Sequence, residues 1–359
     1  MKRMQTWRWV PAALLLAMCG TIGRAEEFAI QSFDGTGEIV FGAVAGATNY
    51  QVKTAPTPTG TWSVALASVA PTAGNAVTAS VPMVSAAAFY RVEAYTNAAP
   101  SVPSGMVLIP GGTNSGTDPD FGAYDLTVSS FYMDQYEVTK AKWDEVYTWA
   151  IANGYGFDHV GSGKAANHPV HTVSWYDVVK WCNARSQKEG RPAVYTVGGA
   201  VYKTGKSDNV VQTSSAGYRL PTDVEWEYAA RGGLSGRRFP WGDSDEIQHA
   251  RANYYSSSSF SYDTSPTRGY HPTYNDGAFP YASPVGSFAA NGYGLYDMSG
   301  NAWEWCFDWY PGYEGSLRVL RGGSWDYGAP YCRVGSRDYH LPGGAHIIFG
   351  FRAALPPGQ

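Results

Sequence analysis

The sequence predicts an α+β chain in two parts, a small all-β domain followed by a larger, loop-rich domain with few regular elements. Short apolar runs separated by turn residues fill residues 28–95, and none of them has the period of a helix. From Met106 onward clusters of Trp, Gly, Asn and Asp dominate, and only three helical patterns occur. The 359 residues suffice for two domains of ordinary size, at about 150 residues each.

The first 25 residues have the pattern of an export signal. Lys2, Arg3 and Arg8 form a basic start, and residues 10–18 form an apolar run that is too short to span a bilayer comfortably. Small residues precede the expected cleavage point after Ala25. We therefore expect a mature protein that is exported, to the periplasm or outside the cell.

Two kinds of membrane attachment are not expected. Cys19 resembles the cysteine of a lipoprotein box only weakly, because Met18 fits poorly before it. Beyond the signal, no stretch approaches the length of a transmembrane segment.

Residues 26–96 predict a small, sandwich-like β domain. Five runs are expected to be strands, because each is apolar and bounded by Gly, Pro, Asn or Thr: EIVFGAV, NYQVKTA, TWSVAL, AVTASVP and FYRVEAY. We find no chemistry in this part and expect it to act in spacing or surface attachment. Residues 97–105 are a Pro/Ala/Ser linker, and residues 106–356 form the second domain.

Three segments of the second domain predict helices. The first, 139–152, begins on Thr139 as its cap. The second, 174–187, begins on Ser174 with Asp177 three residues later, which is a capping pattern, and it carries Cys182 on its inward side. Cys182 is therefore interpreted as a small buried hydrophobe. A third, short helix is expected over 223–231.

Composition and charge exclude several classes of protein. Aromatic residues make up 15% and charged residues only 16%, which is not the composition of a disordered tail or a long coiled coil. The net charge is -4; the first 25 residues hold four of the 26 basic residues and no acid, which leaves 22 against 30 acidic residues, or -8. A mildly acidic protein is not expected to have nucleic acid as its partner.

Eight sequence blocks of the second domain carry a family resemblance. In order they are MVLIPGG, FYMDQYEVTKAKW, HPVHTVSWYDVVKWCN, YRLPTDVEWEYAARGG, FPWGD, NGYGLYDMSGNAWEW, RVLRGGSW and GFRAA. Together they resemble the formylglycine-generating enzyme family, also called sulfatase-modifying factors. The resemblance implies an irregular fold related to C-type lectins, with little regular secondary structure.

The resemblance also implies an activity and a metal. The family oxidises one cysteine of a sulfatase, within a peptide resembling C-x-P-x-R, to formylglycine with O2 and a single Cu(I). Two cysteine thiolates, five residues apart after the GGS turn, grip the copper, because soft Cu(I) prefers thiolate sulfur. The second of these cysteines matches Cys332, but the first matches Tyr327. A phenol is a harder ligand that stays protonated near neutral pH, so copper binding is doubtful here.

Other family positions are present or suggest a different role. Ser324, Trp303 and Tyr331 match the family's pocket. The WEW and GGS segments lie near each other in the family's fold, so Cys306 is a candidate disulfide partner for Cys332. Such a bridge would stabilise the fold by about 3 to 4 kcal/mol and would abolish thiolate chemistry, whereas a free Cys332 would leave the enzyme interpretation open.

Two calcium sites carry over from the family. The first consists of Asp297, Gly300, Ala302 and Glu304, and the second of Asn253, Tyr254, Asp276 and Ala278. Carboxylates and backbone carbonyls are the oxygen ligands that calcium prefers, and the ions are expected to tie loops together. The alternative for Glu304 is a carboxylate buried against the arginines of RVLRGG.

Two classes of function follow. One is a copper-deficient, calcium-stabilised module that binds a peptide, a glycan or a partner protein, because a fold does not fix a function. The alternative is an active oxidase that acts on an exported sulfatase. Within the other polar clusters, His168 and His171 are interpreted as loop anchors, and the carboxylates of TDVEWEY and MDQYEVT as structural.

Overall fold

The computed structural model describes residues 13–15, 30–33, 38–42, 49–55, 63–69, 76–80, 88–95, 102–214 and 216–357. The chain divides into two compact units, one formed mainly by residues up to Val102 and the other mainly by residues from Pro103 to Gly358. No helix among the described residues is long and apolar enough to span a bilayer.

The described residues up to Tyr95 form strands in two sheets. One sheet has the strand order β1-β7-β4-β5 and another the order β2-β3-β6. The strands are β1 (Ala13–Leu15), β2 (Ile30–Phe33), β3 (Glu38–Gly42), β4 (Asn49–Ala55), β5 (Ser63–Val69), β6 (Ala76–Ser80) and β7 (Ala88–Tyr95). All five expected strands are therefore confirmed.

The export signal and its processing stay predictions. Only β1 is described within the predicted signal, and it pairs in parallel with β7. The expected cleavage point after Ala25 and the lipoprotein-box residue Cys19 lie outside the described residues, as do residues 96–101 of the boundary and linker.

The second unit combines four small sheets with three helices, which confirms the α+β class. The sheets have the orders β10-β9, β19-β11-β8, β13-β12-β14 and β17-β16-β15-β18. Their strands are β8 (Met106–Ile109), β9 (Gly112–Asp118), β10 (Gly122–Val128), β11 (Phe131–Asp134), β12 (Tyr195–Val197), β13 (Ala200–Val201), β14 (Val211–Gln212), β15 (Trp303–Trp309), β16 (Arg318–Arg321), β17 (Asp338–His340), β18 (Phe349–Gly350) and β19 (Ala354–Leu355).

The three helices begin at the expected caps. Helix α1 (Lys140–Ala152) follows Thr139, whose side chain accepts from the N–H of Lys142. Helix α2 (Trp175–Lys188) has a complete capping box in which Ser174 and Asp177 bond each other's backbone N–H. Helix α3 (Asp223–Arg231) has a second capping box and ends on Gly232 in the left-handed conformation.

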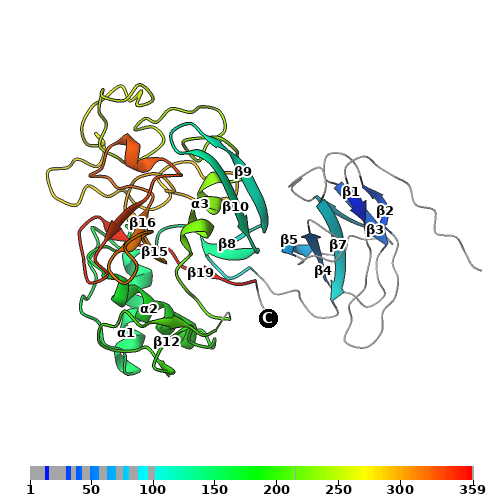
Figure 1. Cartoon of the computed structure of the whole chain (residues 1–359), viewed down its shortest axis with the longest axis horizontal. Helices are drawn as coiled ribbons and strands as arrows, with labels where there is room; N and C mark the ends of the chain where they lie inside the picture. The colour runs from blue at the N-terminus through cyan, green and yellow to red at the C-terminus, as the bar shows by residue number, and fades with distance from the viewer. Residues whose placement is uncertain are drawn as a thin grey trace, which may run out of the picture. The chain divides into compact units, whose positions relative to one another are not determined.

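Helices α1 and α2 lie side by side (Figure 1), and both contribute side chains to one hydrophobic cluster. The indoles of Trp143 and Trp181 stack at 5.9 Å, and Phe351 meets the Trp181 ring edge-on at 5.1 Å. Cys182 is fully buried in the same cluster, which confirms its role as a core residue. In contrast, the fully described stretch from α3 to β15 contains no helix or strand and is drawn as yellow loops in Figure 1.

Candidate functional site

The residues that match the family's pocket come from β15 and from the segment after β16. Trp303 opens β15, and the rings of Tyr327 and Tyr331 meet its indole at 5.5 and 6.1 Å. The two tyrosines contact each other at 5.0 Å with perpendicular rings. Ser324, three residues before Tyr327, is fully buried, and its hydroxyl accepts a hydrogen bond from the N–H of Asp326. The structure thus brings the matched aromatic residues into one group.

Tyr327 is a phenol at the position that matches the family's first copper-binding cysteine. Burial raises the pKa of its phenol, and the nearby Asp338 raises it further. The group is therefore a neutral phenol at physiological pH, with an oxygen that soft Cu(I) does not favour.

Cys332 lies at the end of a short 3-10 helix, η1 (Ala329–Cys332), and is fully buried. Its apolar cluster includes Phe239, Ile247 and Tyr254. Burial raises the pKa of the thiol, which keeps it protonated at neutral pH. Gly323 makes this packing possible, because a Cβ there would lie 2.8 Å from the Cys332 sulfur, and its φ is +77°.

The structure does not show the disulfide expected between Cys306 and Cys332. Among the described residues Cys182, Cys306 and Cys332 are all free thiols. The physical reason is their packing: Cys306 belongs to a cluster with Trp226 and Val334, while Cys332 belongs to a different cluster. Burial also raises the pKa of Cys306, so both sulfurs act as small hydrophobes.

Further aromatic side chains, some exposed and some buried, adjoin this group, and together with Tyr327 and Tyr331 they form what we call the aromatic belt. Its members are Tyr255, Tyr270, Phe279, Tyr281, Trp325, Tyr327 and Tyr331. Phe279 is 62% exposed, and Tyr255 and Tyr331 are each 42% exposed. The N–H of Tyr255 donates to the carbonyl of Tyr327 at 3.0 Å, which joins the two halves of the belt.

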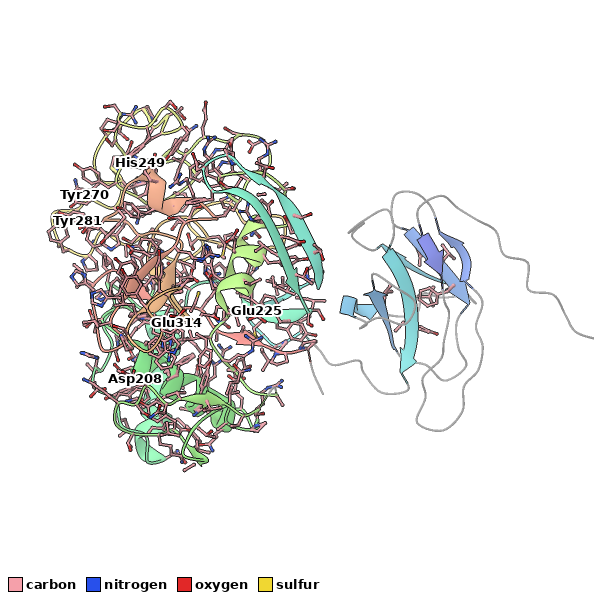
Figure 2. The ribbon with its side chains drawn as sticks, viewed as in Figure 1. Asp208, Glu225, His249, Tyr270, Tyr281 and Glu314 are labelled. Atoms are coloured by element: carbon pink, nitrogen blue, oxygen red, sulfur yellow. The ribbon has the colours of Figure 1, made fainter. Side chains whose placement is uncertain are left out.

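Contacts between rings hold the belt together. Tyr270 and Tyr281 lie side by side at the edge of the domain, with ring centroids 4.9 Å apart (Figure 2). Phe279 contacts Tyr281 at 4.5 Å and Trp325 at 5.6 Å. The indole N–H of Trp325 is buried without a hydrogen-bond partner. Exposed rings over an unpaired donor are suited to binding a ligand that is partly apolar and partly polar.

The sequence indicated an aromatic surplus but did not locate this belt. Its rings come from segments around residues 255, 270, 280 and 328, and only the fold brings those segments together. The signal that could have pointed to it is the recurrence of aromatic residues in an otherwise irregular stretch, in NYYS, RGYH and AFPY.

A buried carboxylate cluster occupies the first predicted calcium position. Glu304 receives two hydrogen bonds of 2.7 Å from Arg352 and a third from the indole of Trp226. Glu304 is thus a carboxylate buried against an arginine, as the alternative interpretation expected. The arginine is Arg352 of the GFRAA block, however, and not one of RVLRGG. Glu137 accepts from the N–H of Ala302 and from Asn301.

The cluster contains three carboxyl groups, those of Glu137, Asp297 and Glu304, beside the guanidinium of Arg352. Burial raises the pKa of Asp297 to about 6 and, helped by the charges of Asp297 and Glu304, raises the pKa of Glu137 well above its usual value. Asp297 Oδ2 accepts from the N–H of Gly286 at 2.6 Å, but its Oδ1 is buried without a partner. An oxygen of this kind is suited to a cation, so the first calcium set fits in part. Gly300 allows the close approach of the Asn253 carbonyl, which a Cβ would meet at 2.2 Å.

The second predicted calcium set is not assembled as expected. Asp276 and the carbonyl of Ala278 both accept hydrogen bonds from the ammonium of Lys164. The side-chain amide of Asn253 donates to the carbonyl of Tyr281, while its Oδ1 is buried without a partner. The carbonyl of Tyr254 lies 3.1 Å from His249 Nε2. No group of three or more His, Cys, Asp or Glu side chains within the described ranges could hold a metal.

His171 is a buried anchor whose charge should affect stability. It is 5% exposed, its Nδ1 pairs with Thr172, and its Nε2 has no partner. Burial lowers its pKa from 6.5 to about 4. The unfolded chain therefore binds this proton more readily, and the stability that neutral His171 contributes above pH 6.5 is lost as the pH falls towards 4.

We expect His171→Gln to change the pH dependence of unfolding. The free energy of unfolding of the wild type, relative to the variant, should fall by about 3 kcal/mol between pH 7.5 and pH 4. Urea titrations at several pH values measure this difference. His346→Gln, at a surface histidine, is the control and should show almost no such change. A constant difference for His171→Gln across this pH range would contradict the assignment.

Comparisons with known proteins agree with this architecture. The family described as "Sulfatase-modifying factor enzyme 1-like domain" matches residues 92–356. The formylglycine-generating enzyme of Bos taurus is 31% identical over 315 residues, which cover 75% of this chain and 81% of that protein. The solved structure of CarF matches with a TM-score of 0.56 and 27% identity, covering 71% of this chain and 99% of CarF.

Relatives with other names are equally similar. "Chaperone protein LppX" of Paenibacillus barcinonensis is 32% identical over 243 residues, covering 63% of this chain and 80% of that protein. "Inactive C-alpha-formylglycine-generating enzyme 2" of Bos taurus is 30% identical over 287 residues, covering 71% and 90%. The expected resemblance is thus confirmed over the second domain, and the chain belongs to the formylglycine-generating enzyme (sulfatase-modifying factor) family.

Proposed function

We propose that this chain is a non-catalytic member of its family that binds a polypeptide through the aromatic belt. The observation that carries the proposal is the state of the copper positions. Tyr327 is a neutral phenol, and Cys332 is a protonated thiol enclosed by apolar side chains. Neither offers the thiolate that Cu(I) requires, while the surface beside them is rich in exposed aromatic rings.

A polypeptide fits this surface best among the partners considered. Tyr, Trp and Phe side chains contribute disproportionately to protein interfaces, because they bury large areas at a low entropic cost. Relatives named as a chaperone and as an inactive enzyme support a role without copper chemistry. The expected partner is an exported polypeptide such as a sulfatase; a glycan is the alternative ligand, and the role requires no nucleic acid.

Selection of peptides on the full-length protein tests the proposal. A library of short random peptides is panned against the wild type, and dissociation constants of the selected peptides are measured by fluorescence anisotropy. A C-x-P-x-R peptide is incubated in parallel with Cu(I) and O2, and its mass is followed. We expect selective peptide binding and no conversion of cysteine to formylglycine. Turnover that requires Cys332 would instead establish the oxidase alternative, and binding of glycans but no peptides would reassign the ligand.

We further propose a structural calcium ion at Asp297, whose unpaired buried oxygen supports it. Gly300 and Ala302 would contribute carbonyl oxygens, and Glu304 would lie close while keeping its pair with Arg352. Such an ion would offset the surplus of buried negative charge and hold the loop before β15. It has no role in chemistry.

Calcium is expected to raise the free energy of unfolding by about 2 to 3 kcal/mol when it is present at about a hundred times its dissociation constant. Thermal unfolding after EGTA treatment, with and without added calcium, measures the effect. Asp297→Asn should abolish it, whereas Asp243→Asn, which changes a surface carboxylate paired with Arg251, should leave it intact. An unchanged calcium effect in Asp297→Asn would show that the ion binds elsewhere.

A further inference from the structure

A lysine ammonium lies among the oxygens of the loop that follows Tyr274. Lys164 Nζ donates to Asp276 Oδ1 at 2.7 Å, to the carbonyl of Ala278 at 3.2 Å and to the carbonyl of Pro280 at 3.0 Å. The side chain is only 22% exposed, although Asp276 is 49% exposed. Lys164 therefore uses all three of its N–H donors on the short loop 276–280, which begins 112 residues after it in the sequence.

The set of acceptors is one that a metal cation would otherwise prefer. One carboxylate and two backbone carbonyls are hard oxygen donors, and none of the three is a nitrogen or sulfur ligand. The lysine charge holds the pKa of Asp276 below its usual value, so the carboxylate stays ionised. The ring of Tyr281 lies 5.8 Å from the ammonium and provides a further favourable contact.

We infer that the ammonium of Lys164 takes the place of the calcium ion expected at Asp276 and Ala278. By holding this loop, Lys164 positions two rings of the aromatic belt, those of Phe279 and Tyr281. Phe279 and Tyr281 flank Pro280, whose carbonyl Lys164 binds, so the loop that carries both rings is tied to residues 162–167. The neighbouring hydrogen bond from the N–H of Val285 to the carbonyl of Asn167 ties the same two segments at a second point.

This inference goes beyond the proposed function, because it concerns the loop and not the ligand. At the first calcium position, the buried Oδ1 of Asp297 has no partner. At the second, Lys164 already binds Asp276 and the carbonyl of Ala278, and only the Oδ1 of Asn253 is buried without a partner. The wild type should therefore bind calcium at one of the two expected positions only, and loop 276–281 should be ordered without it.

Chemical replacement of the lysine tests the charge itself. In Lys164→Cys, the new thiol is alkylated with 2-bromoethylamine, which restores an ammonium at nearly the same distance from the backbone, or with iodoacetamide, which adds a neutral amide. Hydrogen exchange of peptides covering residues 274–281 is then followed by mass spectrometry. The wild type treated with both reagents controls for its own cysteines.

We expect at least a tenfold faster exchange in Lys164→Cys and in its iodoacetamide product, and recovery only after aminoethylation. Lys203→Ala is the matched control, because Lys203 also binds a carbonyl, that of Asn153, and lies over a tyrosine ring, yet is not part of this loop. Unchanged exchange in Lys164→Cys, or equal recovery with the neutral reagent, would overturn the inference.

Calcium provides a second measurement on the same proteins. Calcium should not slow exchange in residues 274–281 of the wild type, and it should do so in Lys164→Ala, where the three oxygens are released. Protection of this loop by calcium in the wild type would overturn the inference. A wild type that binds no calcium at all would refute the proposed ion at Asp297 but would leave the role of Lys164 intact.

Discussion

Arg352→Met is expected to lower the free energy of unfolding by about 3 to 5 kcal/mol. Arg352 and Glu304 are both fully buried, and the guanidinium also binds the carbonyls of Asp134 and Tyr296. Removing it leaves Glu304, Glu137 and Asp297 without their nearest positive charge in a site shielded from water. A buried charge that has lost its partner costs far more than the pair contributed, so this is the largest effect on stability that we expect.

Urea unfolding followed by tryptophan fluorescence measures this loss. Arg251→Met is the control, because Arg251 pairs with Asp243 at the surface, and it should cost no more than about 1 kcal/mol. Arg352→Lys keeps the charge but loses the two-point contact, so we expect an intermediate loss. If Arg352→Met lowers the free energy of unfolding as little as Arg251→Met does, the charge of Arg352 does not stabilise the buried carboxylates.

Phe279→Ala and Tyr331→Ala are each expected to weaken binding of the selected peptides at least tenfold, or by about 1.4 kcal/mol. Both rings are exposed and lie at opposite ends of the aromatic belt. Truncating either should therefore remove ligand contacts while leaving the core unchanged.

The matched control for these variants is Tyr313→Ala. Tyr313 is 51% exposed and contacts Tyr310 and Tyr339 in another aromatic group. Its truncation tests whether the loss of any exposed tyrosine ring would weaken peptide binding. Circular dichroism confirms that each variant is folded. Equal affinities for the wild type, Phe279→Ala and Tyr331→Ala would show that the ligand binds somewhere else.

The elements of this fold were predictable where their signals are local. Thr139 and Ser174 cap their helices by accepting hydrogen bonds from backbone N–H groups only three positions later, so each cap is visible within a few residues of sequence. The five strands of the first unit were predictable for the same reason, since each apolar run is bounded by its own turn residues. The sandwich arrangement of those strands and the lectin-like character of the second domain stay predictions.

The site was less predictable because its contacts are distant in the sequence. The choice of Arg352 over the nearer arginines as the partner of Glu304 depends on the pairing of β15 with β18. Lys164 reaches Asp276 only because two loops meet, and no motif marks that lysine. Similarly, the sequence does not reveal that Cys306 and Cys332 pack in two different hydrophobic clusters.

Titration of the reduced protein with Cu(I), in competition with a chromophoric Cu(I) chelator, measures whether this chain has a copper site. We expect no tightly bound copper, because Cys332 is a buried thiol and position 327 is a phenol. Tyr313→Ala, which leaves the copper positions untouched, should behave identically. One equivalent of tightly bound Cu(I) in the wild type, lost in Cys332→Ser, would contradict the account and identify the chain as a copper enzyme.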